Sequence, residues 1–303
     1  MERLEQILSE IAGRENVREN EPMKNHTTFR AGGAARLFVT PEDEDALVRL
    51  EKTCQSAGVS YTVVGNGSNL LVSDSGYDGV IIQLGSRFAH CRRDGDVLEA
   101  EAGILLSKLA RFACDQGLSG LEFASGIPGS LGGAAVMNAG AYGGEMAHVL
   151  VDALVLTESG ERMVIPAEQM ELGYRSSLIM KRGYTVLKAR VRLVPGDKRQ
   201  IQDRMDELNR RRKEKQPLEY PSAGSTFKRP AGYFAGKLIQ DCGLAGFQIG
   251  GAAVSEKHCG FVINKDQASA RDIYLLCREI QKRVYDRFQV PMEMEVRLLG
   301  DFS

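Results

Sequence analysis

Residues 120–144 read Gly-Leu-Glu-Phe-Ala-Ser-Gly-Ile-Pro-Gly-Ser-Leu-Gly-Gly-Ala-Ala-Val-Met-Asn-Ala-Gly-Ala-Tyr-Gly-Gly, with eight glycines and one charged side chain. Glycine lacks a Cβ, so such a backbone can adopt positive φ and bring its N–H groups close to a ligand. A second run, Gly65-Asn66-Gly67-Ser68-Asn69-Leu70-Leu71, directly follows the apolar segment 61–64, which we expect to be a buried strand. Together the two loops predict a large phosphate-bearing ligand held by main chain.

Neither glycine loop has a familiar nucleotide fingerprint. Leu70 stands where the dinucleotide motif Gly-x-Gly-x-x-Gly needs its third glycine, and no Walker Gly-Lys-Ser/Thr occurs. Each loop taken alone could be a tight turn. The pair favours a cofactor site because it also carries small hydrogen-bonding side chains, namely Ser68, Asn69, Ser125, Ser130 and Asn138.

Composition bounds the class of protein. The 303 residues exceed one ordinary hydrophobic core, so we expect two or three domains. The 33 glycines are about 11% of the chain, against roughly 7% on average. With 39 basic and 40 acidic side chains, the net charge of −1 gives no reason to expect nucleic acid or an anionic membrane as partner.

The chain shows no sign of export or of a metal centre. Leu4, Ile7, Leu8 and Ile11 have helical spacing, which predicts an amphipathic helix rather than a signal peptide. No apolar run approaches the roughly 18 residues of a membrane span, so we expect a cytoplasmic protein. The six cysteines lack metal-ligand spacing, which favours reduced, buried thiols and no metal site.

The first half of the chain predicts alternating helices and strands. We expect a helix that is capped by Thr40, runs through Leu47, Leu50 and Cys54 and stops at Gly58, and another over 105–116. Strands are expected over 61–64, 80–84 and 96–100. A hairpin over 151–165 and a half-buried strand over 187–193 follow.

Pro195-Gly196-Asp197 marks a plausible domain boundary. An amphipathic helix should follow it and end in the basic run 210–215. Cations interact favourably with the C-terminal end of a helix dipole, which explains this run better than a nucleic-acid-binding patch does. Beyond it we expect a helix over 235–242, a strand over 260–264 and a long helix with the capping-box pair Ser269 and Asp272. The final strand, 290–299, should carry Glu293, Glu295 and Arg297 on one face.

Three further segments are candidates for chemistry. Ser225 lies among small residues in Pro221–Pro230, which reads either as a binding loop or as a flexible linker, and it lacks the Gly-x-Ser-x-Gly elbow of a hydrolase. Arg175, in Gly-Tyr-Arg, and Glu295, on the last strand, would ordinarily be surface charges.

These segments occur together, and in order, in a known family. The matching motifs are Asn25–Gly33, Gly65–Leu71, Gly126–Ala134, Asn138–Gly143, Gly173–Ser177, Ser222–Lys228, Val254–His258 and Glu293–Arg297. They cover nearly the whole chain, which resembles the UDP-N-acetylenolpyruvoylglucosamine reductases and looks like their shorter type, without a tyrosine-bearing lid insertion.

The resemblance implies an α+β protein with an FAD-binding fold of the vanillyl-alcohol-oxidase (PCMH) type. That region would span residues 1–197, in subdomains of about 1–85 and 86–197, and an α+β substrate-binding domain would span 198–303. FAD would be bound without a covalent link. The contacts implied for FAD are Gly65, Asn66, Gly67, Ser68, Asn69, Leu70, Ser125, Gly126, Ile127, Pro128, Gly129, Ser130, Gly133, Ala134, Asn138 and Gly140.

The family reaction uses NADPH to reduce FAD, and then reduces the enolpyruvyl ether of UDP-N-acetylglucosamine to UDP-N-acetylmuramate, a peptidoglycan precursor. By resemblance, Arg175 and Glu295 would stabilise the enolate, and Ser225 would protonate the α carbon. Tyr174, Lys215 and Lys228 would bind the substrate, the two lysines at its diphosphate. We expect a monomer.

Two other classes remain open at this stage. A flavin oxidase of the same fold would consume oxygen rapidly once reduced. A nucleotide-sugar-binding regulator without catalysis would purify without colour. The set Arg175, Ser225 and Glu295 argues against both, through the resemblance alone.

Overall fold

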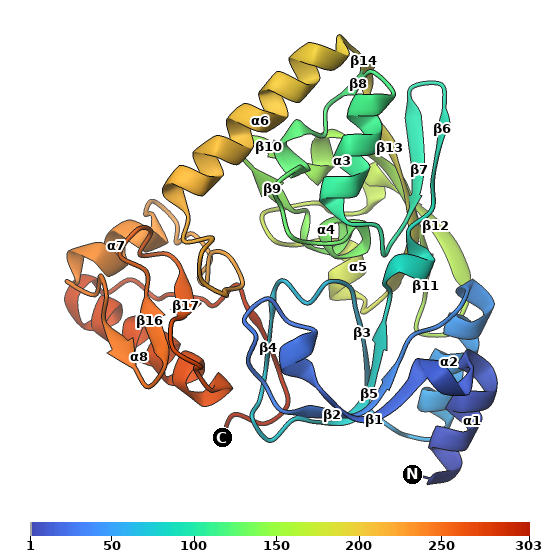
Figure 1. The fold of residues 1–303 in the computed structure, drawn as a ribbon, viewed down its shortest axis with the longest axis horizontal. Helices are drawn as coiled ribbons and strands as arrows, with labels where there is room; N and C mark the ends of the chain where they lie inside the picture. The colour runs from blue at the N-terminus through green and yellow to red at the C-terminus, as the bar shows by residue number, and fades with distance from the viewer. Residues whose placement is uncertain (1) are drawn as a thin grey trace. The chain divides into compact units, whose positions relative to one another are not determined.

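The computed structural model describes residues 2–303 and divides into two compact units (Figure 1). Unit 1 contains residues up to Arg18, Leu37–Asn66 and Gly79–Arg212. Unit 2 contains Glu19–Arg36, Gly67–Asp78 and Lys213–Ser303. The units therefore do not follow the boundary expected near residue 197, because two early segments belong with the C-terminal residues. The functional division into an FAD region and a substrate domain stays a prediction.

The helices agree closely with the periodicity of the sequence. The N-terminus of α2 differs from the prediction. It is capped by the Asp43 side chain, which accepts a hydrogen bond from Ala46 N, so the expected cap at Thr40 is wrong. The capping box of α8, formed by Ser269 and Asp272, is confirmed. The helices are α1 Glu2–Ala12, α2 Glu44–Ser56, α3 Leu106–Asp115, α4 Leu131–Met137, α5 Leu178–Lys181, α6 Lys198–Lys215, α7 Ala235–Asp241 and α8 Ala270–Phe288.

The strands are mostly short. They are β1 Val17–Pro22, β2 Ala34–Val39, β3 Tyr61–Val64, β4 Leu70–Val72, β5 Tyr77–Gln83, β6 Cys91–Asp94, β7 Val97–Glu101, β8 Leu118–Ser119, β9 Gly140–Ala141, β10 Gly144–Glu145, β11 Leu150–Leu156, β12 Arg162–Pro166, β13 Thr185–Arg192, β14 Val194–Pro195, β15 Gln248–Ile249, β16 Ala252–Val254, β17 Val262–Asn264 and β18 Arg297–Leu299. Short 3-10 turns occupy Arg14–Asn16, Met23–Asn25, Ser86–Phe88, Glu122–Ala124, Met146–His148 and Ala167–Gln169.

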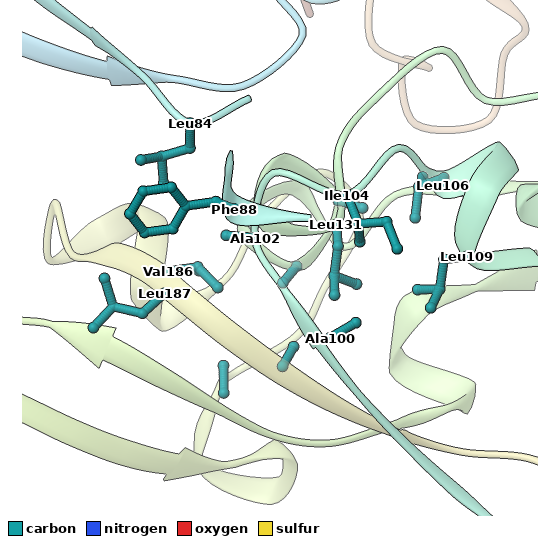
Figure 2. Close-up of a cluster of buried hydrophobic side chains, with 14 of the residues drawn as sticks. Leu84, Phe88, Ala100, Ala102, Ile104, Leu106, Leu109, Leu131, Val186 and Leu187 are labelled. Carbon is teal, nitrogen blue, oxygen red and sulfur yellow. The ribbon is translucent and has the colours of Figure 1, made fainter. Parts of the chain in front are cut away.

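Unit 1 is built around a five-stranded sheet of order β12-β11-β13-β7-β6, whose neighbours are all antiparallel. The expected hairpin is its β11–β12 pair. Helix α4 packs on β13 and β7. Figure 2 shows part of the buried cluster, in which Leu131 of α4 lies between Leu106 and Leu109 of α3 on one side and Val186 and Leu187 of β13 on the other. This core fixes the backbone on both sides of the long glycine run.

A four-stranded sheet of order β1-β2-β5-β3 places β3 parallel to β5. The chain leaves β3 at Val64 and enters the first glycine loop directly, as the sequence predicts. Leu84 N bonds Val64 O at 2.9 Å, which fixes the end of the strand.

Unit 2 has a three-stranded antiparallel sheet of order β15-β16-β17, with α8 packed across it (Figure 1). Ile273, Leu276, Ile280 and Val284 of α8 are fully buried against this sheet and its surroundings. The last strand is shorter than expected, because only Arg297–Leu299 forms β18. It pairs in parallel with β4, and Met294 forms a single bridge to Phe227.

Candidate functional site

The two glycine runs meet within unit 1. Asn66 Nδ2 donates a 2.6 Å hydrogen bond to Pro128 O. A Cβ added at Gly65 would lie 2.1 Å from Ser130 Oγ, so a side chain at this position would have to displace the Ser130 hydroxyl. The structure therefore brings together two of the segments predicted to hold one cofactor.

Packing within the chain accounts for several glycines of the long run. A Cβ on Gly126 would lie 2.6 Å from Asn209 Oδ1 of α6, and one on Gly132 would lie 2.8 Å from the Ala102 Cβ. On Gly140 a Cβ would lie 2.6 Å from Gly144 O, across the β9–β10 pair. Gly132 and Gly140 therefore need glycine whether or not a ligand is present, whereas a side chain at Gly126 would require the Asn209 side chain to move.

Gly133 is different, and it fits a bound cofactor. Its missing Cβ would point into open space, with Ser130 Oγ 3.7 Å away as the nearest contact. Glycine inside a helix lowers stability by about 1 kcal/mol relative to alanine. No close packing at Gly133 explains this choice of residue. An exposed helical backbone without a side chain is what a closely approaching ligand such as FAD requires.

The start of α4 is not a free anion site. The N–H groups of Leu131 and Gly132 already donate to Ile104 O at 2.9 Å and Ala102 O at 2.8 Å. Ser130, the N-cap residue, makes no side-chain capping bond, and its hydroxyl instead faces Gly65. The residues that would hold FAD in unit 1 therefore present loop backbone and the Ser130 hydroxyl, rather than the first amides of the helix.

Arg175 lies on a strained two-residue turn. Gly173 and Ser176 close the turn with mutual backbone hydrogen bonds of 3.0 and 3.2 Å, leaving Tyr174 and Arg175 at its tip. Arg175 has φ +53°, a left-handed conformation that costs a side-chain-bearing residue about 1 kcal/mol or more. Its guanidinium carbon lies 5.0 Å from the centroid of the Tyr174 ring. The turn thus holds Arg175 in a backbone conformation that side-chain-bearing residues seldom adopt.

The C-terminal end of α4 holds this turn on both sides. Asn138 Nδ2 donates to Gly173 O at 3.2 Å, while its Oδ1 accepts from Ala147 N at 2.8 Å. Ser177 Oγ donates to Val136 O at 2.7 Å and accepts from Met180 N at 3.1 Å. Asn138 is 1% exposed and Ser177 is fully buried. The Asn138 side chain, predicted as a cofactor contact, is thus fully engaged in positioning the Tyr174–Arg175 turn, and Ser177 was missed.

The Ser225 segment in unit 2 is an ordered loop. Thr226 N donates to Gly260 O at 2.9 Å, and Thr226 Oγ1 accepts from Val262 N at 2.9 Å. Lys228 N donates to Glu293 O at 2.8 Å. These bonds argue against the flexible-linker interpretation. Gly224, with φ +74°, and the buried Thr226 leave Ser225 exposed between them.

Glu295 is fixed beside the same segment through its main chain. Its N–H donates to Thr226 O at 2.8 Å, and its carbonyl accepts from Asn69 Nδ2 at 3.0 Å. The Glu295 Oε2 atom is buried, whereas the Glu293 side chain is 71% exposed. The expectation that Glu293 and Glu295 share one solvent-facing strand surface is therefore wrong. Hydrogen bonds thus join Thr226, the neighbour of Ser225, to Glu295 and Asn69 within unit 2.

The remaining predicted residues differ in their surroundings. Lys228 forms an ion pair with Glu293, and Lys215 is the exposed last residue of α6. Gly67 has φ +61°, and its missing Cβ would lie 1.9 Å from His26 O, so the first loop is held against the Asn25–Gly33 motif. His258 Nδ1 accepts from Gly260 N at 3.1 Å, and burial lowers the His258 pKa.

The other predicted cofactor residues are placed as follows. Ser68 and Asn69 are half-buried, and Leu70 begins β4, while Ser125 is buried and donates to Glu122 O at 2.9 Å. Ile127 and Pro128 follow the turn at Ser125 and Gly126, and Ala134 is buried in α4. In residues 2–303 no group of three His, Cys, Asp or Glu side chains could hold a metal ion, and no helix is long and apolar enough to span a bilayer.

Comparison with known proteins first defines the class. Residues 35–165 match a family described as an FAD binding domain, which contains both Gly65 and the long glycine run. Residues 216–299 match the C-terminal domain of UDP-N-acetylenolpyruvoylglucosamine reductase. The chain is thus an FAD-binding protein with a second, specific domain.

Relatives over the full length define the family. The chain is 50% identical to the UDP-N-acetylenolpyruvoylglucosamine reductase of Clostridium perfringens, over 97% of this chain and 96% of that protein. It is 49% identical to that of Agathobacter rectalis, over 94% of each chain. The crystal structure of the Thermus caldophilus reductase is 37% identical and superposes with a TM-score of 0.80, covering 94% of this chain and all of that one. The chain belongs to the UDP-N-acetylenolpyruvoylglucosamine reductase family, and the resemblance read from the motifs is confirmed.

Proposed function

We propose that this protein reduces the enolpyruvyl ether of UDP-N-acetylglucosamine to UDP-N-acetylmuramate, with NADPH as reductant and noncovalent FAD as cofactor. Family membership supports the reaction. The observation in this chain that carries it is the hydrogen-bonded group of Thr226, Glu295 and Asn69, next to which Ser225 lies exposed. The product would serve peptidoglycan precursor synthesis.

Bound FAD would supply hydride transfer, taking hydride from NADPH and giving it to the alkene carbon β to the substrate carboxylate. The protein must then manage the negative charge that develops at the α carbon and its carboxylate. We assign that task to Arg175, by direct electrostatic attraction, and to Glu295, by hydrogen bonding. The rigid Tyr174–Arg175 turn suits preorganised charge stabilisation, because little reorganisation is needed during the reaction.

Ser225 would donate the proton that completes the reduction at the α carbon. A hydroxyl is a weak acid, so the role requires a strongly basic carbanion and a hydroxyl held within reach. Support comes from the ordered loop, in which Thr226 is bonded on three sides while the neighbouring Ser225 stays exposed. Lys215 and Lys228 would bind the diphosphate and Tyr174 the nucleotide sugar.

Single-turnover kinetics of Ser225→Ala test the assignment. Loss of a general acid costs about a hundredfold to ten-thousandfold. NADPH should still reduce the flavin of the variant at the wild-type rate, whereas reoxidation by the nucleotide sugar should slow by that factor. Ser222→Ala, three residues upstream on the same segment, is the control and should behave as wild type. Unchanged reoxidation in Ser225→Ala would remove Ser225 from the mechanism.

We include a monomeric state and a cytoplasmic location in this proposal. The six cysteines are free thiols, which suits a reducing compartment. Sedimentation of the purified enzyme at micromolar concentration tests the monomer, and fractionation of cells tests the location.

A further inference from the structure

Arg212 differs from the other basic residues at the end of α6. Its side chain lies against the long glycine run: a Cβ on Gly126 would lie 3.1 Å from Arg212 Cδ and 3.4 Å from Nη1. Asn209, one turn earlier, contacts the same glycine. The end of α6 therefore rests on the loop that precedes Ser130, and places a guanidinium there.

This guanidinium is partly withdrawn from water without a counter-ion. Burial lowers the pKa of Arg212, and the neighbouring Tyr142 offsets the effect only in part. Among residues 2–303 no carboxylate forms an ion pair with Arg212, and no protein group accepts a hydrogen bond from it. Arg211, the next residue, is exposed and pairs with Glu207. A half-buried cation is costly when it is unpaired, so an anion from outside the chain is expected at Arg212.

We propose that Arg212 binds a phosphate group of a nucleotide ligand at the Gly126 loop, an inference that rests on the proposed function. A planar guanidinium offers paired donors that match phosphate oxygens, and a desolvated position strengthens such a contact. The phosphate can come from FAD, from NADPH or from the nucleotide sugar. Because the Ser125–Ser130 loop is the predicted flavin segment, FAD is the first source to test.

The experiment compares Arg212→Met, which keeps the apolar stem, with Arg212→Lys, which keeps the charge. Arg211→Met is the control from the same helix turn. Apoprotein is titrated with FAD, following quenching of flavin fluorescence, and KM is measured for NADPH and for the nucleotide sugar. A charge-assisted hydrogen bond is worth roughly a tenfold to hundredfold change in affinity. We expect Arg212→Met to weaken one of the three ligands by that factor, and Arg212→Lys to weaken the same ligand less.

The ligand that weakens identifies the source of the phosphate. Values for all three ligands within threefold of the Arg211→Met control would overturn the proposal, as would losses of equal size for all three ligands in Arg212→Met, which would indicate general damage to the loop rather than a lost phosphate contact. If Arg212→Met does not fold, Arg212→Gln replaces it. The FAD titration needs no turnover, so failure of the wild-type enzyme to reduce the sugar would contradict the proposed function while leaving this test intact.

Discussion

Asn138→Asp offers a selective perturbation of the Tyr174–Arg175 turn. Aspartate keeps an oxygen that can accept from Ala147 N, and it tolerates the left-handed backbone of Asn138, whose φ is +43°. It replaces the amide donor that bonds Gly173 O at 3.2 Å with an oxygen facing an oxygen. The variant should therefore loosen the turn while sparing the rest of the junction.

The size of the effect follows from the burial of this contact. Asn138 is 1% exposed, so the Gly173 carbonyl cannot readily exchange its lost partner for water. Leaving a buried acceptor unsatisfied costs about 1–3 kcal/mol. If that cost falls on the productive geometry of Arg175, reoxidation of reduced flavin by the nucleotide sugar slows by about 5- to 150-fold.

Stopped-flow measurement of both half-reactions separates positioning from general damage. Flavin content and reduction by NADPH should stay near wild type in Asn138→Asp, and only the second half-reaction should slow. In an Arg175→Ala background the same change should have little further effect, because the group it positions is gone. Equal slowing of both half-reactions, or an undiminished loss in the Arg175→Ala background, would refute the positioning role.

Three other perturbations have defined outcomes. Burial raises the pKa of Glu51 from 4.5 to about 7, so the free energy of unfolding is unaffected by Glu51 below pH 4.5, falls as the pH rises through 7, and is lower by about 3 kcal/mol above it. Glu51→Gln should therefore flatten the dependence of urea unfolding on pH between about pH 5 and 8. An unchanged slope would contradict this. Gly65→Ala should weaken FAD in fluorescence titrations at least tenfold by displacing Ser130 Oγ, and adding Ser130→Ala should recover part of the loss; wild-type affinity in Gly65→Ala would contradict the loop contact. Lys228→Ala should raise KM for the nucleotide sugar far more than it lowers kcat, whereas Glu293→Ala, which frees the ammonium, should not raise KM; a pure kcat effect of Lys228→Ala would argue against a binding role.

Local patterns predicted the elements but not every boundary. The capping box of Ser269 and Asp272 marked the start of α8 because both partners lie within one turn. At α2, Thr40 and Asp43 both suit an N-cap, and the choice of Asp43 became clear only from its bond to Ala46 N. The last strand was predicted too long, because its alternation reflects the burial of Met292 and Val296, while pairing with β4 begins only at Arg297.

The motifs located most of the site, yet the links between its parts lay beyond the reach of sequence reasoning. Asn138 bonds a carbonyl 35 residues away, and Asn69 reaches Glu295 across 226 residues. Both looked like cofactor contacts because a small amide in a glycine-rich loop is equally suited to a ligand and to a distant backbone group. Arg212 was attributed to the helix dipole, since sequence cannot show which cation of a basic run turns inward.

Anaerobic titration of the purified protein, followed by its visible spectrum, tests the central claim most directly. NADPH is added first and the enolpyruvyl ether of UDP-N-acetylglucosamine second. The account predicts a flavin spectrum that bleaches with NADPH and returns in proportion to the sugar added, with UDP-N-acetylmuramate as product. A colourless protein, or a bleached flavin that recovers with oxygen but not with the sugar, would contradict it.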